Sequence, residues 1–397
     1  MQTITSAETQ KTRAVLEITD TFNKLYKTSP LVVRSPGRVN IIGEHTDYNQ
    51  GFVLPAAIDK ASYVAIGKRD DNEIHLYSCE FEENFKTSLS ALSPTTVGWP
   101  NYVLGVVDQL LNLGFPVSGF NLVVAGDIPI GAGLSSSAAL ECATAYAMNQ
   151  LFNFKLSRNL LAGIAQKAEH SYAGVMCGIM DQFASLFGKK NHVIKLDCRS
   201  MEFEYFPLDM TGIKIVLFNT NVKHSLSSSE YNVRRQQCEQ GVEWVQEYEP
   251  EIRSLRDCTL EMLDKNVASK DELIYRRCKY VVEENIRLLK ACDDLKKGDI
   301  KSLGQRMFET HDGLKRDYEV SCKELDFLVD QVKGNPDVLG ARMMGGGFGG
   351  CTINLVKEEA IDRLVEKVSK VYREEMDKDL SVYIAKIEEG TSIEVIK

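Results

Sequence analysis

The sequence lacks the features that would set it apart from ordinary globular proteins. It has no apolar run long enough to cross a bilayer, and residues 1–11 are polar, without the apolar core of a signal peptide. We also find no internal repeat and no low-complexity segment. We therefore expect neither a membrane span nor a leader. The 397 residues, 44% of them hydrophobic, are enough for large cores in about two or three domains.

Paired cysteines and an excess of positive charge are missing as well. The ten cysteines are scattered, and no two of them form a C-x-x-C pair. This spacing argues against zinc and indicates reduced, mostly buried thiols, so we expect a cytoplasmic protein. The formal net charge of −9 argues against nucleic acid as a general partner.

Against this background, one glycine- and serine-rich segment is unusual. Residues 131–137 read Gly-Ala-Gly-Leu-Ser-Ser-Ser and run directly into helix-forming residues. Glycine lets the backbone approach a ligand, and the free N–H groups and dipole of a helix start attract anions. The segment lacks the Lys of a Walker A motif and the third glycine of a dinucleotide fingerprint. It predicts either a phosphate-binding loop or a plain serine N-cap after a turn.

A second segment crowds polar side chains into a few positions. It follows a strand predicted over Leu31–Val33, and the pair Pro36 and Gly37 predicts a turn at its start. The polar residues behind this turn are Arg38, Asn40, Glu44, His45, Asp47 and Tyr48. Three interpretations stay open: carboxylate and imidazole ligands of a metal, hydrogen-bond partners of a polyol, or a solvated turn.

Two further acids stand apart from these segments. Glu169 lies on a helix predicted over residues 157–173, with Ser157 as its N-cap. Asp181 follows Gly178 in apolar surroundings. It is either a buried carboxylate with a partner and a task, or the cap of the next helix.

An aromatic pair precedes a helix predicted to run through Leu113. Its members, Trp99 and Tyr102, are separated by a proline and an asparagine. They are either core residues or a surface on which a nucleobase stacks. Their spacing alone favours the core.

A second glycine segment covers residues 345–350. It matches G-x-G-x-x-G, but a strand predicted over Cys351–Val356 follows it where a dinucleotide site requires a helix. We therefore reject a dinucleotide site. The backbone of this segment could still approach a phosphate.

Together, these segments resemble the motifs of the GHMP small-molecule kinases. The resemblance rests on residues 34–47, 131–139 and 340–351. Within that family, residues 37–49 look like the galactokinase signature, and residues 177–182 and 229–232 also resemble galactokinases. The similarity extends from about Leu31 to Ile387.

The resemblance implies an α+β (mixed α/β) fold of two domains, with the active site in the cleft between them. The domains would be residues 1–205 and 206–397. The implied reaction transfers the γ-phosphoryl group of ATP to the C1 hydroxyl of α-D-galactose, with Mg²⁺ as cofactor and with a monomer or weak homodimer as the enzyme. The alternatives are a kinase of N-acetylgalactosamine or arabinose, or a non-catalytic regulator that binds galactose and ATP.

The resemblance also implies roles for individual residues. By position, Asp181 and Arg38 match catalytic residues of the family. The positions that match its sugar site are Arg38, Glu44, His45, Thr46, Asp47, Gly178, Asp181 and Tyr231. The positions near its nucleotide are Ser78, Trp99, Tyr102, Gly131, Ala132, Gly133, Leu134, Ser135, Ser136, Ser137, Gly346 and Gly347. The positions that match its metal ligands are Ser137 and Glu169.

Overall fold

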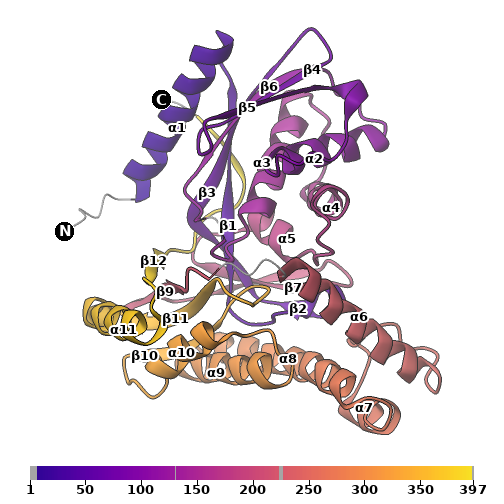
Figure 1. The fold of residues 1–397 in the computed structure, drawn as a ribbon, viewed down its shortest axis with the longest axis vertical. Helices are drawn as coiled ribbons and strands as arrows, with labels where there is room; N and C mark the ends of the chain where they lie inside the picture. Colours follow the sequence, from indigo (N-terminus) through magenta and orange to yellow (C-terminus); the bar gives the residue numbers. More distant parts are fainter. Residues whose placement is uncertain (1–6, 130, 223–226, 396–397) are drawn as a thin grey trace.

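The computed structural model describes residues 7–129, 131–222 and 227–395, which form three β-sheets with helices around them (Figure 1). The strands are β1 Leu31–Asn40, β2 Phe52–Val53, β3 Pro55–Lys68, β4 Glu73–Ser78, β5 Glu83–Ser88, β6 Phe120–Gly126, β7 His192–Asp197, β8 Phe203–Pro207, β9 Ile213–Asn219, β10 Val338–Met343, β11 Cys351–Lys357, β12 Ser381–Ala385 and β13 Ser392–Glu394. The α-helices are α1 Ala7–Tyr26, α2 Pro100–Asn112, α3 Ser136–Leu151, α4 Arg158–Ala168, α5 Met180–Phe187, α6 Ser227–Gln246, α7 Leu260–Asn266, α8 Glu272–Lys296, α9 Ile300–Arg316, α10 Lys323–Val332 and α11 Ile361–Met376. The short 3₁₀ or π segments are η1 Asp47–Asn49, η2 Leu89–Ala91, η3 Glu169–Ala173 and η4 Glu358–Ala360.

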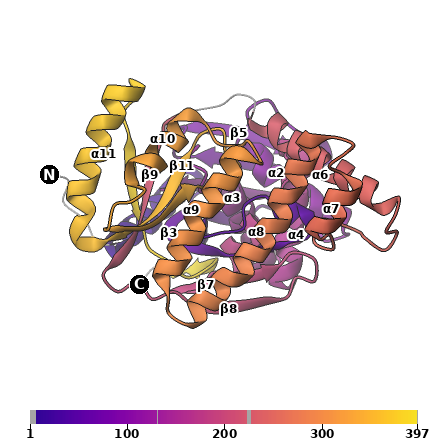
Figure 2. The same cartoon turned by 90° about the horizontal axis from the view of Figure 1, so that it is seen from below.

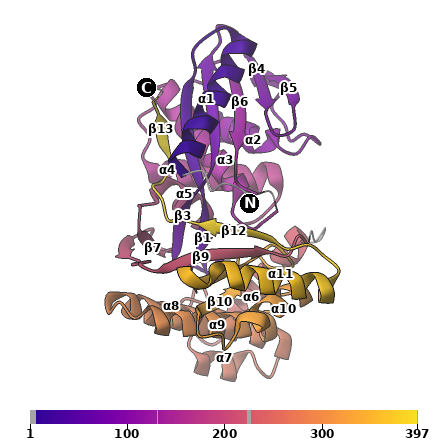
Figure 3. The same ribbon diagram turned by 90° about the vertical axis from the view of Figure 1, so that its left-hand side faces the viewer.

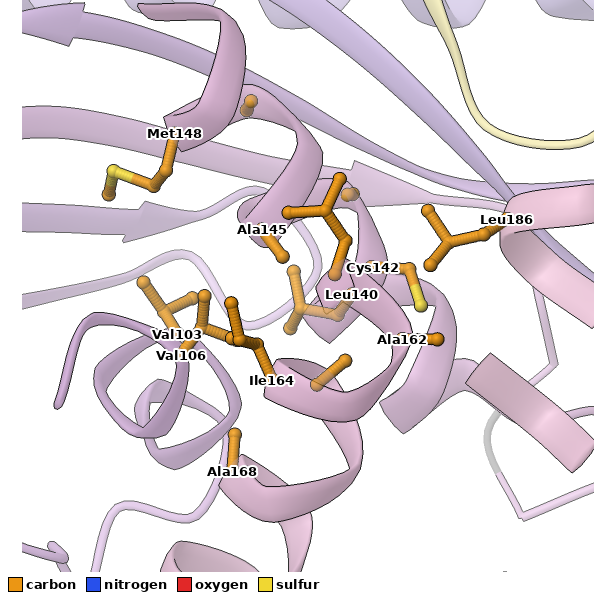
Figure 4. Close-up of a cluster of buried hydrophobic side chains, with 14 of the residues drawn as sticks. Val103, Val106, Leu140, Cys142, Ala145, Met148, Ala162, Ile164, Ala168 and Leu186 are labelled. Atoms are coloured by element: carbon orange, nitrogen blue, oxygen red, sulfur yellow. The ribbon is translucent and has the colours of Figure 1, made fainter. Parts of the chain in front are cut away.

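The largest sheet has six strands in the order β13-β1-β3-β6-β4-β5, antiparallel except between β4 and β6. Successive side chains of a strand point to opposite faces, so Val32 joins the core under α1 while Val33 joins the core under α2 to α5. Helix α3 is buried on nearly all sides: Leu140 and Met148 belong to the same buried apolar cluster as Val103 of α2 (Figure 4). This packing fixes the start of α3, where the serine-rich segment ends.

A second sheet has four antiparallel strands in the order β10-β11-β9-β12. Helices α8 and α9 lie side by side next to it (Figure 2). One core contains Leu217 of β9, Leu288 of α8 and Met307 of α9, together with Ile41 and Leu54 from the N-terminal half. The two halves of the chain therefore share a buried core beside the polar segment that follows β1.

The third sheet is small, with its strands in the order β2-β7-β8. At its C-terminal end the chain returns to the six-stranded sheet. Strand β13 pairs with β1 at the edge of the six-stranded sheet, on which α1 also lies (Figure 3). The mixed α/β architecture predicted from the sequence is thus confirmed. Among the described residues, no helix combines the length and the apolarity that crossing a membrane requires.

The turn predicted at Pro36 and Gly37 is wrong, because β1 continues through both residues to Asn40. The ladder between β1 and β3 shifts its register between Pro36 and Arg38, which is a β-bulge. Pro36, which has no N–H to donate, still lies opposite Ala61 at the edge of this irregularity, and Gly37 is the residue that the ladder skips. The bulge brings Gly37 against the serine-rich segment: the Arg38 N–H donates to the Leu134 carbonyl at 3.1 Å.

The start of the helix predicted over residues 157–173 is confirmed, but its last residues are not α-helical. The Ser157 hydroxyl accepts a hydrogen bond from the Leu160 N–H and caps α4, as expected. The α-helical pattern stops at Ala168, and Glu169–Ala173 are π-helical. Such wide turns often occur at functional sites, and this one carries Glu169.

Candidate active site

The segments singled out in the sequence meet around one cavity of about 480 Å³. It lies where the serine-rich segment, the turn after β1, the start of α5, the start of α6 and the loop between β10 and β11 come together. Of the predicted site residues, those that line it are Arg38, Glu44, His45, Asp47, Gly131, Gly133, Leu134, Ser135, Ser136, Ser137, Glu169, Gly178, Asp181, Tyr231, Gly346 and Gly347.

The serine-rich segment reaches α3 through left-handed backbone conformations. Gly131 and Gly133 have φ of +73° and +71°, and Ser135 has φ of +59°. Ser135 occupies the N-cap position, but its side chain makes no cap bond and donates to Asp181 instead. The serine N-cap interpretation is therefore wrong. The start of α3 faces the cavity without a side-chain cap, so its dipole and N–H groups can attract an anion there.

The second glycine segment is the connection between β10 and β11, so the predicted strand after it is confirmed. Its Gly345 N–H donates to Glu44 Oε1 at 2.9 Å. A side chain at Gly347 would overlap the Val320 carbonyl, and φ there is +85°, so glycine is required. A Cβ at Gly345 would lie 3.6 Å from the Gly133 carbonyl oxygen, which shows that the two glycine segments pack against each other.

Arg38 and Asp181 form a two-bond ion pair at the centre of the cavity wall. Arg38 Nε donates to Oδ1 at 2.8 Å and a terminal nitrogen donates to Oδ2 at 3.0 Å. Arg38 also donates to the Gly133 carbonyl at 2.6 Å. Burial on its own would lower the pKa of Arg38, but Asp181 and Glu44 outweigh it and raise that pKa. The pair places a carboxylate and a guanidinium, joined by two hydrogen bonds, next to the serine-rich segment.

Asp181 does not cap a helix. It lies in the first turn of α5, whose N-cap residue is Ile179. Its carboxylate is bound by Arg38 and Ser135, and its side chain is 26% exposed on the cavity side. The structure thus gives this acid charged and polar partners within reach of a ligand.

Glu44 is held by groups from the C-terminal half of the chain. Its Oε1 accepts from the fully buried Arg342 and from Gly345, both at 2.9 Å. Burial alone would raise the pKa of Glu44, but Arg342 and Arg38 hold it below its ordinary value. Thr46 differs from this pattern, because its hydroxyl donates within its own turn to the Gly43 and Phe52 carbonyls and does not line the cavity.

His45, Asp47, Gly178 and Tyr231 form a further part of the cavity wall. The His45 and Tyr231 rings pack with their centroids 5.3 Å apart. Burial raises the pKa of Asp47 to about 7, with Asp181 and Glu44 contributing. A side chain at Gly178 would overlap the Asp47 carboxylate, so this glycine makes room for it.

Glu169 faces the cavity beside the start of α3. It accepts from the Ser137 hydroxyl at 3.0 Å and from the Gln182 amide at 2.8 Å. Burial raises the pKa of Glu169, and the negative charge of Asp181 adds to this. Buried carboxylates with little positive charge beside them are a setting that a cation stabilises.

The metal interpretation of Glu44, His45 and Asp47 finds no support. Glu44 is already bound by Arg342, and the His45 ring is bound by Tyr48. The described ranges contain no group of three or more histidines, cysteines or acids placed to hold a metal ion.

Ser78, Trp99 and Tyr102 do not line this cavity. The Ser78 hydroxyl accepts from the Phe81 N–H, and Trp99 Nε1 donates to Glu83 at 2.9 Å. Trp99 and Tyr102 pack against the core under the six-stranded sheet, as their spacing favoured. A role beside the nucleotide stays a prediction for these residues.

Several residues that hold the site were missed in the sequence. Glu284 accepts from the Gly43 N–H at 2.8 Å, Asn285 from the Phe52 N–H at 2.9 Å, and Tyr280 donates to the Glu44 carbonyl at 3.1 Å. All three are on α8, far along the chain, and no local pattern connects them to the turn after β1. Arg342 carried one usable signal: it is a charged residue within the third motif, in a strand buried along nearly its whole length.

Family comparisons agree with this geometry. Residues 20–68 match the galactokinase galactose-binding signature, 101–189 the N-terminal domain of GHMP kinases, and 289–374 the C-terminal GHMP kinase domain. The fold is therefore that of a GHMP kinase. Galactokinase from Thermotoga neapolitana is 44% identical over 352 residues, which cover 88% of this chain and 96% of the relative. Galactokinase from Roseiflexus sp. strain RS-1 is 37% identical, covering 94% and 96%. This chain belongs to the galactokinase family and is an ATP-dependent sugar kinase.

Solved structures agree with this assignment. The crystal structure of Lactococcus lactis galactokinase complexed with galactose matches with a TM-score of 0.91 and 35% identity, covering 95% of this chain and 99% of that one. Mevalonate kinase from Methanococcus jannaschii matches with a TM-score of 0.63 at 20% identity, covering 91% and 99%. The second match concerns the fold alone.

Proposed function

We propose that this chain transfers the γ-phosphoryl group of ATP to the C1 hydroxyl of α-D-galactose, giving galactose 1-phosphate and ADP. The observation that carries the proposal is the position of Asp181. Its carboxylate, held by Arg38, lies in one cavity with the uncapped start of α3 and the Glu44–Asp47 turn. A nucleophilic hydroxyl and a phosphate could meet there.

The sugar would lie against the wall formed by Glu44, His45, Asp47, Gly178 and Tyr231. Carboxylates accept hydrogen bonds from hydroxyls, and an imidazole either donates or accepts, so these groups can distinguish hydroxyl positions. Thr46 would contribute only by shaping the turn, since its hydroxyl is used internally.

The phosphates of ATP would bind the two glycine segments. The N–H groups and dipole at the start of α3 favour negative charge. Gly346 lines the same cavity, and a Cβ there would only come into ordinary contact with the Tyr231 ring, at 3.4 Å. We keep Ser78, Trp99 and Tyr102 as proposed neighbours of the nucleotide on the side of α2.

Ser137 and Glu169 fit a Mg²⁺ ion, because both are oxygen donors at the cavity and Glu169 has little positive charge beside it. Mg²⁺ commonly uses one or two protein oxygens and takes the rest from phosphates and water. When bound, it would neutralise charge on the phosphate oxygens.

The chemical step needs position and charge more than covalent chemistry. Asp181 can orient the C1 hydroxyl and accept its proton, while Arg38 can neutralise charge on the transferring group. A nearby arginine weakens an aspartate as a base. In a loose transition state the hydroxyl loses its proton late, so Asp181 would act mainly by orienting the hydroxyl.

Two further proposals concern the whole enzyme. We place the division between domains at residue 205, with β13 returning to the first sheet. We also expect a cytoplasmic enzyme that is a monomer or weak homodimer. The ten unpaired cysteines are consistent with a reducing compartment.

A coupled assay of ADP release with a panel of sugars tests the proposal. Galactose should support turnover, and glucose, which differs at C4, should be a poor substrate because buried polar groups would be left unpaired. Faster turnover with N-acetylgalactosamine or arabinose would reassign the substrate. Binding of galactose and ATP without ADP release would indicate a regulator.

A further inference from the structure

A row of buried hydrogen-bonding side chains leads from the sugar wall into the helical layer. His45 Nδ1 lies 2.8 Å from the Tyr48 hydroxyl, which lies 2.7 Å from the Tyr318 hydroxyl. The Tyr318 hydroxyl in turn lies 3.3 Å from Cys238 Sγ. The row joins three segments: the turn after β1, the loop between α9 and α10, and α6.

The hydrogen bonds of this row can run in only two directions, because each hydroxyl has one proton to donate. Burial raises the pKa of Tyr48 and of Tyr318 well above the usual value, so both phenols stay protonated at neutral pH. Either each group donates toward His45, whose Nδ1 then accepts, or Nδ1–H donates and every bond is reversed.

The surroundings of His45 select the first direction. Burial, reinforced by Arg234, lowers the pKa of His45 to about 4, so the ring is neutral at pH 7 and carries one proton. A phenol O–H is a stronger donor than an imidazole N–H, and an imidazole nitrogen is a stronger acceptor than a phenol oxygen, so the bond of 2.8 Å favours Tyr48 as the donor and Nδ1 as the acceptor. The proton of the neutral ring is then on Nε2, which is buried and has no hydrogen-bond partner in the described part of the chain.

We propose that Tyr318 is a positioning residue that acts through Tyr48 to hold His45 as the Nε2–H tautomer. Tyr318 is fully buried and does not line the cavity, so it acts without touching substrate. This proposal rests on the proposed galactokinase activity and deepens it. The sugar site would then combine the acceptors Glu44 and Asp47 with a donor, and one sugar hydroxyl could donate to a carboxylate while it accepts from His45.

The tautomer can be measured directly in the sugar-free protein. In ¹⁵N spectra of histidine-labelled enzyme at neutral pH, the signals lost in His45→Gln identify His45, and they should show the Nε2–H pattern. Tyr318→Phe removes one hydroxyl without changing ring shape and should give a mixture of tautomers. Tyr372→Phe is the matched control, since this ring is also fully buried but its hydroxyl donates outside the row and away from the cavity, to the Thr220 carbonyl. It should leave the tautomer unchanged.

Kinetics separate this role from general damage to the fold. Losing one buried hydrogen bond corresponds to about a three- to tenfold effect, so Tyr318→Phe should raise KM for galactose by that factor and leave KM for ATP unchanged. Cys238→Ser keeps a donor at the end of the row and should retain the wild-type tautomer.

Two results would overturn the proposal: an Nδ1–H pattern for His45 in the wild type, or an unchanged tautomer in Tyr318→Phe. A shifted tautomer with unchanged KM for galactose would equally refute the link to the sugar. If no sugar supported ADP release, the proposed function would fail, and the spectra would still decide whether the row sets the tautomer.

Discussion

At the scale of single residues, the Arg38–Asp181 pair gives the sharpest prediction. Asp181→Asn replaces one of the two oxygens that bind Arg38 with an amide that cannot accept its N–H. We expect the variant to fold and to bind ATP, and to lose at least about a hundredfold in kcat, as removal of a general base does. ADP release under saturating galactose measures the loss.

The matched control is Asp71→Asn. Asp71 makes the same two-bond pair with Arg69, but on the exposed surface away from the cavity. It should keep wild-type kcat. Retention of more than about a tenth of kcat in Asp181→Asn would show that the base lies elsewhere.

Glu169 makes a different prediction, because it faces Ser137 and not the sugar wall. Glu169→Ala should lose most turnover at ordinary Mg²⁺ concentrations, while the dissociation constant for galactose, measured by calorimetry, stays within about twofold. Wild-type turnover in this variant would exclude Glu169 as a metal ligand. A large loss of galactose affinity would instead indicate that the residue supports the whole site.

Asp47 should make stability depend on pH. Its pKa is raised to about 7, whereas an unfolded aspartate titrates near pH 4, so between these values the folded state binds more protons than the unfolded state. Rising pH therefore removes stability across this window. Relative to Asp47→Asn, the free energy of unfolding of the wild type should fall by up to about 4 kcal/mol from acid to neutral pH. Parallel urea-denaturation curves for both proteins would contradict this.

At the scale of elements, the loop between β10 and β11 depends on close backbone approach. Gly347 and Gly334 both have positive φ, +85° and +83°, but a side chain at Gly347 would overlap Val320 while Gly334 has open space. Gly334→Ala should cost about 1 kcal/mol, from the strained conformation alone. Gly347→Ala should cost clearly more in urea denaturation. Equal losses would mean that the loop shifts without cost.

Among these elements, some could be predicted from the sequence and others could not. The glycine segments and the Arg38–Asp47 segment were predictable, because each consists of neighbouring residues whose chemistry is local. The turn at Pro36 was wrong, since a bulge lets a strand pass through proline, and only the neighbouring strand reveals it. Arg342 and Tyr318 were missed because their partners, Glu44 and Tyr48, are hundreds of residues away.

At the scale of the whole molecule, the C-terminal tail joins the edge of the six-stranded sheet and also contacts α5. Deleting residues 388–397 removes β13 and takes away the Glu389 carbonyl that accepts from buried Arg34. It also removes Thr391, which donates to Ser185. We expect Tm to fall by about 5 °C or more in calorimetry, since each lost kcal/mol lowers it by a few degrees. An unchanged Tm would show that the tail is dispensable.

The pairing of β13 with β1 also means that the two ends of the described chain meet: Lys11 Nζ lies 2.9 Å from Glu394 Oε2. A short peptide could join them, and the ring could be reopened at Gly298, which has open space beside it between α8 and α9. In such a circular permutant, Arg342 would be synthesised before Glu44. The two partners of this fully buried ion pair would then leave the ribosome in the reverse order. Correct folding of this permutant would show that the architecture of this kinase does not depend on the order in which its chain is made.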